Sequence, residues 1–459
     1  MNDTNDLEVD SISNERRRLM FGGAALAGVG ALAAHMAQAD TSGSPNYYVV
    51  ATVFDVTAFG ATPSRVGSPS ATDCAAAFNA AILAAKNAGG GIVFVPRGTY
   101  LLKSSVVVNA SNIRIVGEGR RVSILNGSGI TGAILSFNTS VNDTQIINCG
   151  AEHLSLLGTT DPKAADQCMA IYNTAKSVFR SLELEAPLNT TTGNSLLYIA
   201  RSWINHFYDL HFSGTAPYAG LYIYRPTGTD MTSNALHFFG CNFYSNGTPY
   251  GVVIDGNGDS AGDIYNFNGL TCQGYSGVGF WAKRANNVGV QGFYGEANAK
   301  DVQLGNTSGT LSYAIGVSID NWSTNGATSS IHLDACRSVK IGPGYAANFS
   351  NAGILVGSVT GGFIFARNVG RDQSDPNSGT KPPIKFLSGS YNSSATGLMI
   401  FDGDAHEYPD WPTVVNKMGL ILKPDASATF GKHYKIYVDD TGVVKTQLYQ
   451  LDTNGYLTY

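Results

Sequence analysis

The central part of the chain carries acidic, aromatic and amide residues at a spacing that suits acid–base chemistry on one surface. Apolar residues recur there in the pattern Φ-x-x-Φ-x-Φ, where Φ is apolar, and the first five copies begin 28, 28, 31 and 29 residues apart. In an extended strand the residue between two inward-facing residues points outward, so equivalent outward positions of successive copies form columns. The columns gather these side chains: Glu183, Glu185, Asp209, His211, Tyr244, Gln273, Tyr294 and Glu296.

Carboxylates dominate the first copies of these columns. Two carboxylates a few ångströms apart are what glycoside hydrolysis requires, one as the acid and the other as the base or nucleophile. Neighbouring copies place Glu183 and Glu185 beside Asp209, so we expect these three residues to be catalytic, with Glu296 as a competing residue on a later copy. The columns contain no Lys or Arg, which favours hydrolysis, because a lyase must neutralise a uronate carboxylate. A solvated outer face explains the same residues and stays open as an alternative.

The remaining polar and aromatic members of the columns suit sugar binding. Imidazole and amide groups can hydrogen-bond to sugar hydroxyls, and aromatic rings can pack on the apolar faces of sugar rings. We therefore expect His211, Tyr244, Tyr294 and Gln273 to bind substrate, beside a column of glycines.

The period of the pattern indicates the fold class. A period of 20–50 residues implies a stacked or radial architecture, and a propeller blade would need ~40–45 residues. The copies are short alternating runs rich in Gly, Asn and Thr, which argues against helical repeats. A coil of about 28 residues fits an all-β fold, a parallel β-helix whose coils stack ~4.8 Å apart. Looser copies begin at Val290, Cys336 and Thr360.

The segment before the repeats predicts a cap for the open end of such a β-helix. Apolar residues from Cys74 to Ala85 recur at helical spacing, with Thr72 or Asp73 as the N-cap and Gly89 at the end, which predicts a helix of roughly 14 residues. An amphipathic helix at this place would cover the unpaired edges of the first coil. We expect Pro96–Gly98 to form the corner between two strands of that coil.

Residues 52–125 carry the most specific resemblance to a known family. The stretches Phe54–Ala61, Ala77–Ile82 and Gly89–Tyr100 (GGGIVFVPRGTY) resemble the N-terminal signature of the pectate-lyase-like superfamily, in the branch of rhamnogalacturonase- and epimerase-like domains. The resemblance implies a right-handed parallel β-helix that acts on polysaccharide. It is architectural over residues 126–370, and the signature carries no catalytic residue, so function is inferred by analogy.

The N-terminal residues predict an export signal. Three arginines, Arg16–Arg18, precede an apolar run from Leu19 to Ala34, and Ala37–Ala39 matches a cleavage site. Arginines before a mild Gly- and Ala-rich run resemble a twin-arginine signal, so we expect a periplasmic or extracellular protein without a membrane span after cleavage. An ordinary secretion signal or an anchor is the alternative.

The net charge and the cysteine content limit the classes of partner and cofactor that the sequence predicts. The chain has a net charge of -5 and 14% charged residues, which carries no basic signature of nucleic-acid binding. Its six cysteines form no CxxC pair, so the sequence contains no zinc or redox motif of this type. We expect most of the cysteines to be small buried hydrophobic residues. We expect no required cofactor. The loop Asp255–Asp263 places oxygen side chains at calcium-loop positions 1, 3, 5 and 9 but lacks the Gly and Glu of positions 6 and 12. Calcium binding by this loop is therefore a minor hypothesis beside a Gly- and Asp-rich turn between coils.

These observations predict three regions. Residues 1–39 are the export signal, residues 40–370 the β-helix, and residues 371–459 a linker with a small C-terminal β appendage that includes a hairpin over Gly431–Gln450. The leading functional hypothesis is a secreted polysaccharide-degrading glycoside hydrolase. A lyase or epimerase acting on uronates is the alternative enzyme, and a carbohydrate-binding or adhesive β-helix is the non-catalytic alternative. The partner is a polysaccharide, and a homo-oligomer is compatible with each hypothesis.

Overall fold

A computed structural model provides the structure of the chain, which divides into the units Met1–Val50 and Ala51–Tyr459. The described residues all belong to the second unit: 52–66, 68, 72–158, 165–186, 194–226, 232–256, 262–306, 313–365, 369, 384–386 and the strands 396–402, 419–422, 433–438, 444–451 and 457–458. The expected export signal and the linker at Asp372–Pro383 lie outside these residues. Among the described residues, no helix combines the length and apolar character needed to cross a membrane.

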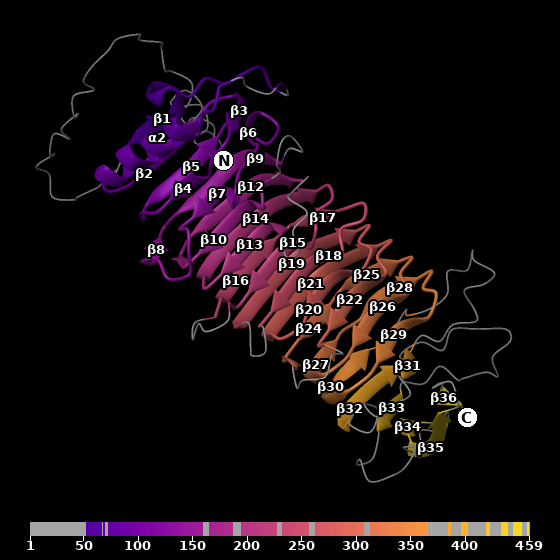
Figure 1. Cartoon of the computed structure of the whole chain (residues 1–459). Coiled ribbons are helices and arrows are strands. Elements are labelled where there is room, and N and C mark those ends of the chain that lie inside the picture. Colours follow the sequence, from indigo (N-terminus) through magenta and orange to yellow (C-terminus); the bar gives the residue numbers. More distant parts are fainter. Residues whose placement is uncertain are drawn as a thin grey trace, which may run out of the picture. The chain divides into compact units, whose positions relative to one another are not determined.

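Two sheets of parallel strands alternate along the chain and form a right-handed parallel β-helix (Figure 1). Sheet B has eleven strands: β4 (Val106–Val108), β7 (Ala133–Phe137), β10 (Gln167–Tyr172), β13 (Ser195–Ala200), β15 (Ala219–Tyr224), β18 (Tyr250–Asp255), β20 (Val278–Ala282), β22 (Lys300–Leu304), β26 (Ser329–Leu333), β29 (Ala352–Val356) and β31 (Ile384–Phe386). Each of these strands pairs in parallel with its equivalent in the next coil.

Sheet A contains the strands that carry the repeated pattern. Its parallel part comprises β1 (Val53–Asp55), β2 (Gly91–Val95), β3 (Gly98–Leu102), β5 (Ile113–Gly117), β6 (Ser123–Gly127), β8 (Ile146–Ile147), β9 (Gly150–Gly158), β11 (Thr174–Ala175), β12 (Val178–Glu185), β14 (Trp203–Ser213), β16 (Asn234–Phe239), β17 (Asn242–Tyr244), β19 (Asp263–Gln273), β21 (Asn286–Glu296), β23 (Ala314–Ile315), β24 (Ser318–Asp320), β25 (Trp322–Asn325), β27 (Cys336–Ile341), β28 (Gly344–Ala347), β30 (Val359–Phe365) and β32 (Thr396–Asp402). The antiparallel strands β33 (Gly419–Leu422), β34 (His433–Val438), β35 (Val444–Leu451) and β36 (Leu457–Thr458) follow.

The register of sheet A confirms the first six copies of the repeat. Phe179 pairs with Phe207, which pairs with Phe238, and Phe238 pairs with Phe267. Their rings stack with centroids 5.1, 4.4 and 4.7 Å apart, the spacing that stacked coils impose. The outward positions pair as expected, from Ser155 through Glu183, His211, Asn242 and Thr271 to Tyr294.

The last two expected copies are wrong in register. Ile319 pairs with Val290 and with Ile341, and Ile341 pairs with Ile364, so these isoleucines continue the phenylalanine column. Phe363 instead pairs with Lys340 on the outer face. The apolar pattern does not detect the coil of Ile319, because the polar residue Thr324 occupies the third apolar position of that coil.

A bend in the left-handed region separates the two halves of each repeat. The residue two places after the first apolar position has φ +58° at His153, +50° at Ser181, +53° at Asp209 and +61° at Gly240, and the column continues with Gly269 and Gly292. This one-residue bend allows apolar residues three places apart both to point inward, which explains the x-x spacing in the pattern.

The N-terminal cap is confirmed. Helix α2 (Ala75–Asn87) begins at the N-cap Cys74 and not at the expected Thr72 or Asp73, although the Asp73 carboxylate accepts a hydrogen bond from the Ala75 N–H at 3.0 Å. The 3-10 helix η1 (Val56–Phe59) packs with α2 and β1 at the first coil. Gly98 forms the expected corner with φ +137°, and a Cβ there would lie 2.5 Å from the Pro63 Cβ. Only glycine fits this corner.

The C-terminal region confirms the expected hairpin and extends the parallel ladder. Strands β34 and β35 pair antiparallel, as predicted for Gly431–Gln450. Parallel pairing nevertheless continues through β31 and β32, beyond the boundary expected at residue 370. The six cysteines are buried and free, as expected.

Candidate active site

A loop from the N-terminal coils closes over the carboxylates of the outward columns. It links β5 to β6 and carries Arg120 and Arg121, of which Arg121 adopts φ +58°. The Arg121 N–H donates to Ser155 Oγ at 2.8 Å, and Ser155 is fully buried. The hydrogen bond fixes both arginines against the coil of β9.

Arg121 holds the two glutamates of β12. Its Nη2 contacts the carboxylates of both Glu183 and Glu185, and hydrogen bonding to Glu183 raises the pKa of Arg121 above its usual range. Ser155 Oγ also donates to Glu183 at 3.3 Å. The Glu183 side chain retains only 14% exposure. Two of the three expected catalytic carboxylates are therefore already engaged by one guanidinium.

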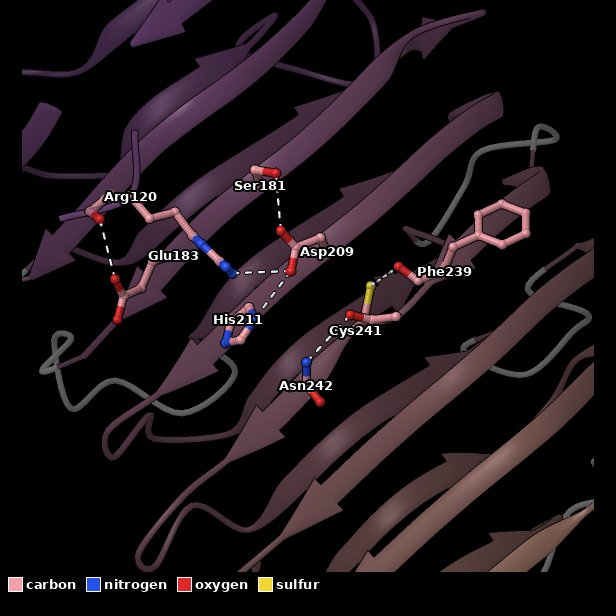
Figure 2. Close-up of polar contacts among 10 residues, drawn as sticks. Arg120, Ser181, Glu183, Asp209, His211, Phe239, Cys241 and Asn242 are labelled. Carbon is pink, nitrogen blue, oxygen red and sulfur yellow. Dashed lines mark hydrogen bonds and ion pairs between the residues drawn. The ribbon is translucent and has the colours of Figure 1, made fainter. Parts of the chain in front are cut away.

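Asp209 is the centre of a more exposed cluster (Figure 2). Its Oδ1 lies 3.2 Å from Arg120 Nη1 and 3.2 Å from His211 Nε2, and its Oδ2 accepts a hydrogen bond from Ser181 Oγ at 3.0 Å. The side chains of Asp209 and His211 are 46% and 41% exposed. The left-handed backbone at Asp209 directs its carboxylate to the outer face between these partners. A histidine oriented by a carboxylate can take up or deliver a proton.

The two arginines correct one expectation from the sequence. The columns themselves lack Lys and Arg, but the folded site does not, because Arg120 and Arg121 reach Asp209, Glu183 and Glu185 from a loop outside the repeat. The pair Arg120-Arg121 directly follows the strand exit Val116–Gly119, and that adjacency was the available signal. The absence of cations near the carboxylates, which favoured hydrolysis, is therefore not a property of the folded site; hydrolysis itself stays a prediction.

Glu296 lies in a separate cluster on the same sheet. Gln273 Nε2 donates to Glu296 Oε2 at 2.7 Å, and the Tyr294 hydroxyl donates to the same oxygen at 3.0 Å. This hydrogen bond raises the pKa of Tyr294. The register places Tyr294 three coils beyond His211, a distance of ~14 Å. Tyr244 pairs with Gln273 and is 59% exposed. The structure thus groups Tyr244, Gln273, Tyr294 and Glu296, apart from Asp209.

A buried acid beneath this second cluster was not anticipated. Asp301 on β22 is fully buried, accepts a hydrogen bond from Asn298 Nδ2 at 2.8 Å through Oδ1, and has no partner for Oδ2. Desolvation raises the pKa of Asp301 to about 7, and the Glu296 charge adds to the effect. A Cβ on Gly295 would lie 2.6 Å from Asp301 Oδ1, so the carboxyl is packed against backbone. Burial separates it from any substrate.

The described residues contain no group of three or more His, Cys, Asp or Glu side chains able to hold a metal ion. Most of the loop proposed for calcium lies outside the described residues. Its first member, Asp255, forms an ion pair with Lys283 at 3.2 Å. The calcium hypothesis stays a prediction.

Comparisons with known proteins bear on the fold and the family. Residues 53–246 match the family model described as rhamnogalacturonase A/epimerase, pectate lyase-like. A search of curated proteins found no sequence match.

Several solved structures share the architecture. The A-module of mannuronan C-5 epimerase AlgE6 from Azotobacter vinelandii has 17% identity and a TM-score of 0.52, covering 76% of this chain and 100% of that one. The surface adhesin PfbA of Streptococcus pneumoniae has 12% identity and a TM-score of 0.53, covering 86% and 99%. The enzymatically active domain of tailspike protein 2 of bacteriophage CBA120 has 10% identity and a TM-score of 0.51, covering 89% and 70%. At these identities the likeness shows the fold alone.

Proposed function

From the match of residues 53–246 to the rhamnogalacturonase A/epimerase, pectate lyase-like family model, we propose that the protein is an enzyme acting on acidic polysaccharide through His211 and Asp209. The observation that carries the proposal is the placement of Asp209 between His211 and Arg120 on the exposed face of sheet A. This arrangement favours the lyase or epimerase alternative over hydrolysis.

The chemistry needs one base and one cation. A uronate loses the proton beside its carboxylate more readily when a cation neutralises the charge that develops on that carboxylate. His211, oriented by Asp209, takes this proton. Arg120 binds the substrate carboxylate, because a guanidinium offers five donors and the contact with Asp209 leaves others for a ligand.

The released electron pair then determines the product. If the pair forms a carbon–carbon double bond, the bond to the glycosidic oxygen breaks and that oxygen takes a proton, which is elimination. If a proton instead returns to the same carbon from the opposite face, the product is the epimer. Glu183 and Glu185 keep Arg121 and its loop in place in either case, while Tyr244, Gln273, Tyr294 and Glu296 contact further sugars of the chain.

The experiment is a panel of uronate-rich and neutral polysaccharides with three readouts. Absorbance of unsaturated uronates reports elimination, proton NMR of the sugar configuration reports epimerisation, and reducing ends without absorbance report hydrolysis. We expect one of the first two signals on a uronate polymer. New reducing ends without the other two signals would indicate hydrolysis by the paired carboxylates. No signal on any polymer would favour a carbohydrate-binding protein without catalytic activity.

Matched variants test the residues. His211→Gln and Arg120→Ala should each lower turnover by ~100-fold or more, the scale of a lost acid–base group. His237→Gln is the control, because this histidine also lies on sheet A but bonds to Asn266. Equal activity of all three variants would show that the chemistry lies elsewhere.

We also propose that the protein is exported, as a polysaccharide substrate outside the cytoplasm requires. The arginines at Arg16–Arg18 before the apolar run support this. Replacing all three with Lys in the full chain should retain the protein in the cytoplasm, as cell fractionation would show.

A further inference from the structure

Sheet B carries a run of aromatic side chains on its outer face that the proposed catalysis does not use. The outward positions pair from Tyr198 to Tyr222, then through Val253 to Trp281, and further rings flank this line on β10, β18 and the turn before β15. We call the following six residues the aromatic strip: Tyr172, Tyr198, Tyr218, Tyr222, Tyr250 and Trp281. Figure 1 shows β10, β13, β15, β18 and β20, which bear the strip, in successive coils.

The rings of the strip touch one another without covering one another. Consecutive centroids lie 5.6, 5.8, 4.8, 5.2 and 5.1 Å apart from Tyr172 to Trp281. Their planes are tilted by 48° to 73°, whereas the stacked phenylalanines of the core are tilted by 5° to 11°. Tilted neighbours leave parts of each ring face open, so the strip differs from a stack that only stabilises the coils.

The strip is partly exposed and lies outside the hydrophobic core. All six side chains retain intermediate exposure, and none belongs to the core cluster. On sheet A, Asn242 and Thr271 occupy outward positions of two successive coils, so a stable coil does not need an aromatic residue outside. Partly exposed aromatic rings in contact over five coils, which the core does not include, are a candidate interaction site.

The polar groups of the strip point to a sugar ligand. Five of its rings are tyrosines, and burial raises the pKa of Tyr172 and Tyr218, so their hydroxyls keep the proton and can both donate and accept hydrogen bonds. Rings with such polar tips suit a ligand with apolar faces and hydroxyl edges. Lys283 lies 4.2 Å above the Trp281 ring and pairs with Asp255 at 3.2 Å, so this cation is neutralised within the protein.

We propose that the aromatic strip binds a polysaccharide chain along the helix axis and does not cleave it. The strip spans five coils, or about 20 Å, which suits several sugars rather than one. Asp255, the acid beside it, is engaged by Lys283, and Lys283 also donates to the Tyr218 hydroxyl at 3.0 Å. The strip therefore retains the polymer while chemistry occurs on sheet A, and it does not depend on the role of His211.

The test compares polymer binding with turnover in the full chain. Affinity electrophoresis in gels containing alginate, polygalacturonate or dextran measures binding. The double variant Tyr198→Ala/Tyr222→Ala should weaken binding to the polymer that wild type retains by at least ten-fold, and leave turnover of short oligosaccharides unchanged. Tyr345→Ala is the control, because this tyrosine is 45% exposed on sheet A, and it should change neither quantity.

A second measurement uses only the wild-type protein, so misfolding of a variant cannot explain its result. Nitration of wild-type tyrosines, mapped by mass spectrometry, should be slowed by the bound polymer at Tyr198 and Tyr222 and unaffected at Tyr345. Wild type that binds none of the polymers, or binding without protection of the strip, would overturn the proposal. If His211→Gln stays active while the strip variant loses binding, the proposed catalysis fails and the strip stands.

Discussion

Replacing Asp301 with Asn should stabilise the protein above neutral pH, because its buried carboxyl becomes ionised there without a full set of partners. Asn298 satisfies Oδ1 and nothing bonds to Oδ2. Asparagine keeps an acceptor for Asn298 and removes the charge. The change tests whether an interior acid in the coil of β22 limits stability.

The direction and size of the effect follow from linkage. Burial raises the pKa of Asp301 from 3.8 to about 7. Below pH ~4 both folded and unfolded chains carry the proton, and between ~4 and ~7 only the folded chain retains it, so the free energy of unfolding falls as pH rises and levels off above ~7. The full difference is on the order of 4 kcal/mol, an upper bound on the gain from Asp301→Asn at pH 8.

Thermal unfolding of wild type and variant at pH 4, 6 and 8 measures this effect. The melting temperatures should coincide at pH 4 and separate progressively towards pH 8, with the variant higher by several degrees. Glu296→Gln should shift the wild-type profile only slightly, because desolvation is the larger cause and the Glu296 charge a lesser one. A variant that melts below wild type at every pH would refute the reasoning and show that the ionised carboxylate is well accommodated.

Other predictions concern the fold and the site. Leu210→Asp should unfold the central coils, because a buried unpaired carboxylate costs several kcal/mol, whereas His211→Ala should leave the melting temperature nearly unchanged; equal damage would mean that the register is off by one. Gly98→Ala should destabilise the first coil by more than ~1 kcal/mol in chemical denaturation, because the corner has φ +137° and contacts Pro63. Asp209→Asn should lower turnover by ~100-fold with normal circular dichroism, and Glu185→Gln should act mainly by loosening Arg121, as weaker protection of the loop in hydrogen exchange would show.

The sequence predicted the architecture where each coil repeats one apolar pattern. Phe179, Phe207, Phe238 and Phe267 recur at nearly constant spacing, and their stacking follows directly. The prediction failed from Ile319 onward because Thr324 and then Gly344 replace the apolar residues that the pattern requires. Burial in a coil depends on shape as well as polarity, and a threonine fills an inward position there.

The candidate site was only half predictable for a different reason. Aligning the repeats brought Ser181, Asp209 and His211 together, because their neighbours are set by the register. Arg120 contacts Asp209 from 89 residues away in the sequence, and its loop belongs to no repeat. A periodic pattern carries no information about such a contact, so the cation that changes the inferred chemistry emerged only from the folded chain.

The residues with left-handed backbone that form one outward column of sheet A differ on the two sides of Asp209. On the N-terminal side of Asp209 the column holds the side chains of Ser181 and His153, and Arg121 covers Ser155 beside them. On the C-terminal side it continues as Gly240, Gly269 and Gly292, which present no side chain. A polymer whose reacting sugar sits at His211 can therefore extend freely only towards Tyr244 and Tyr294. The backbone geometry that bends each coil thus also limits the direction in which a polymer bound at His211 extends along sheet A.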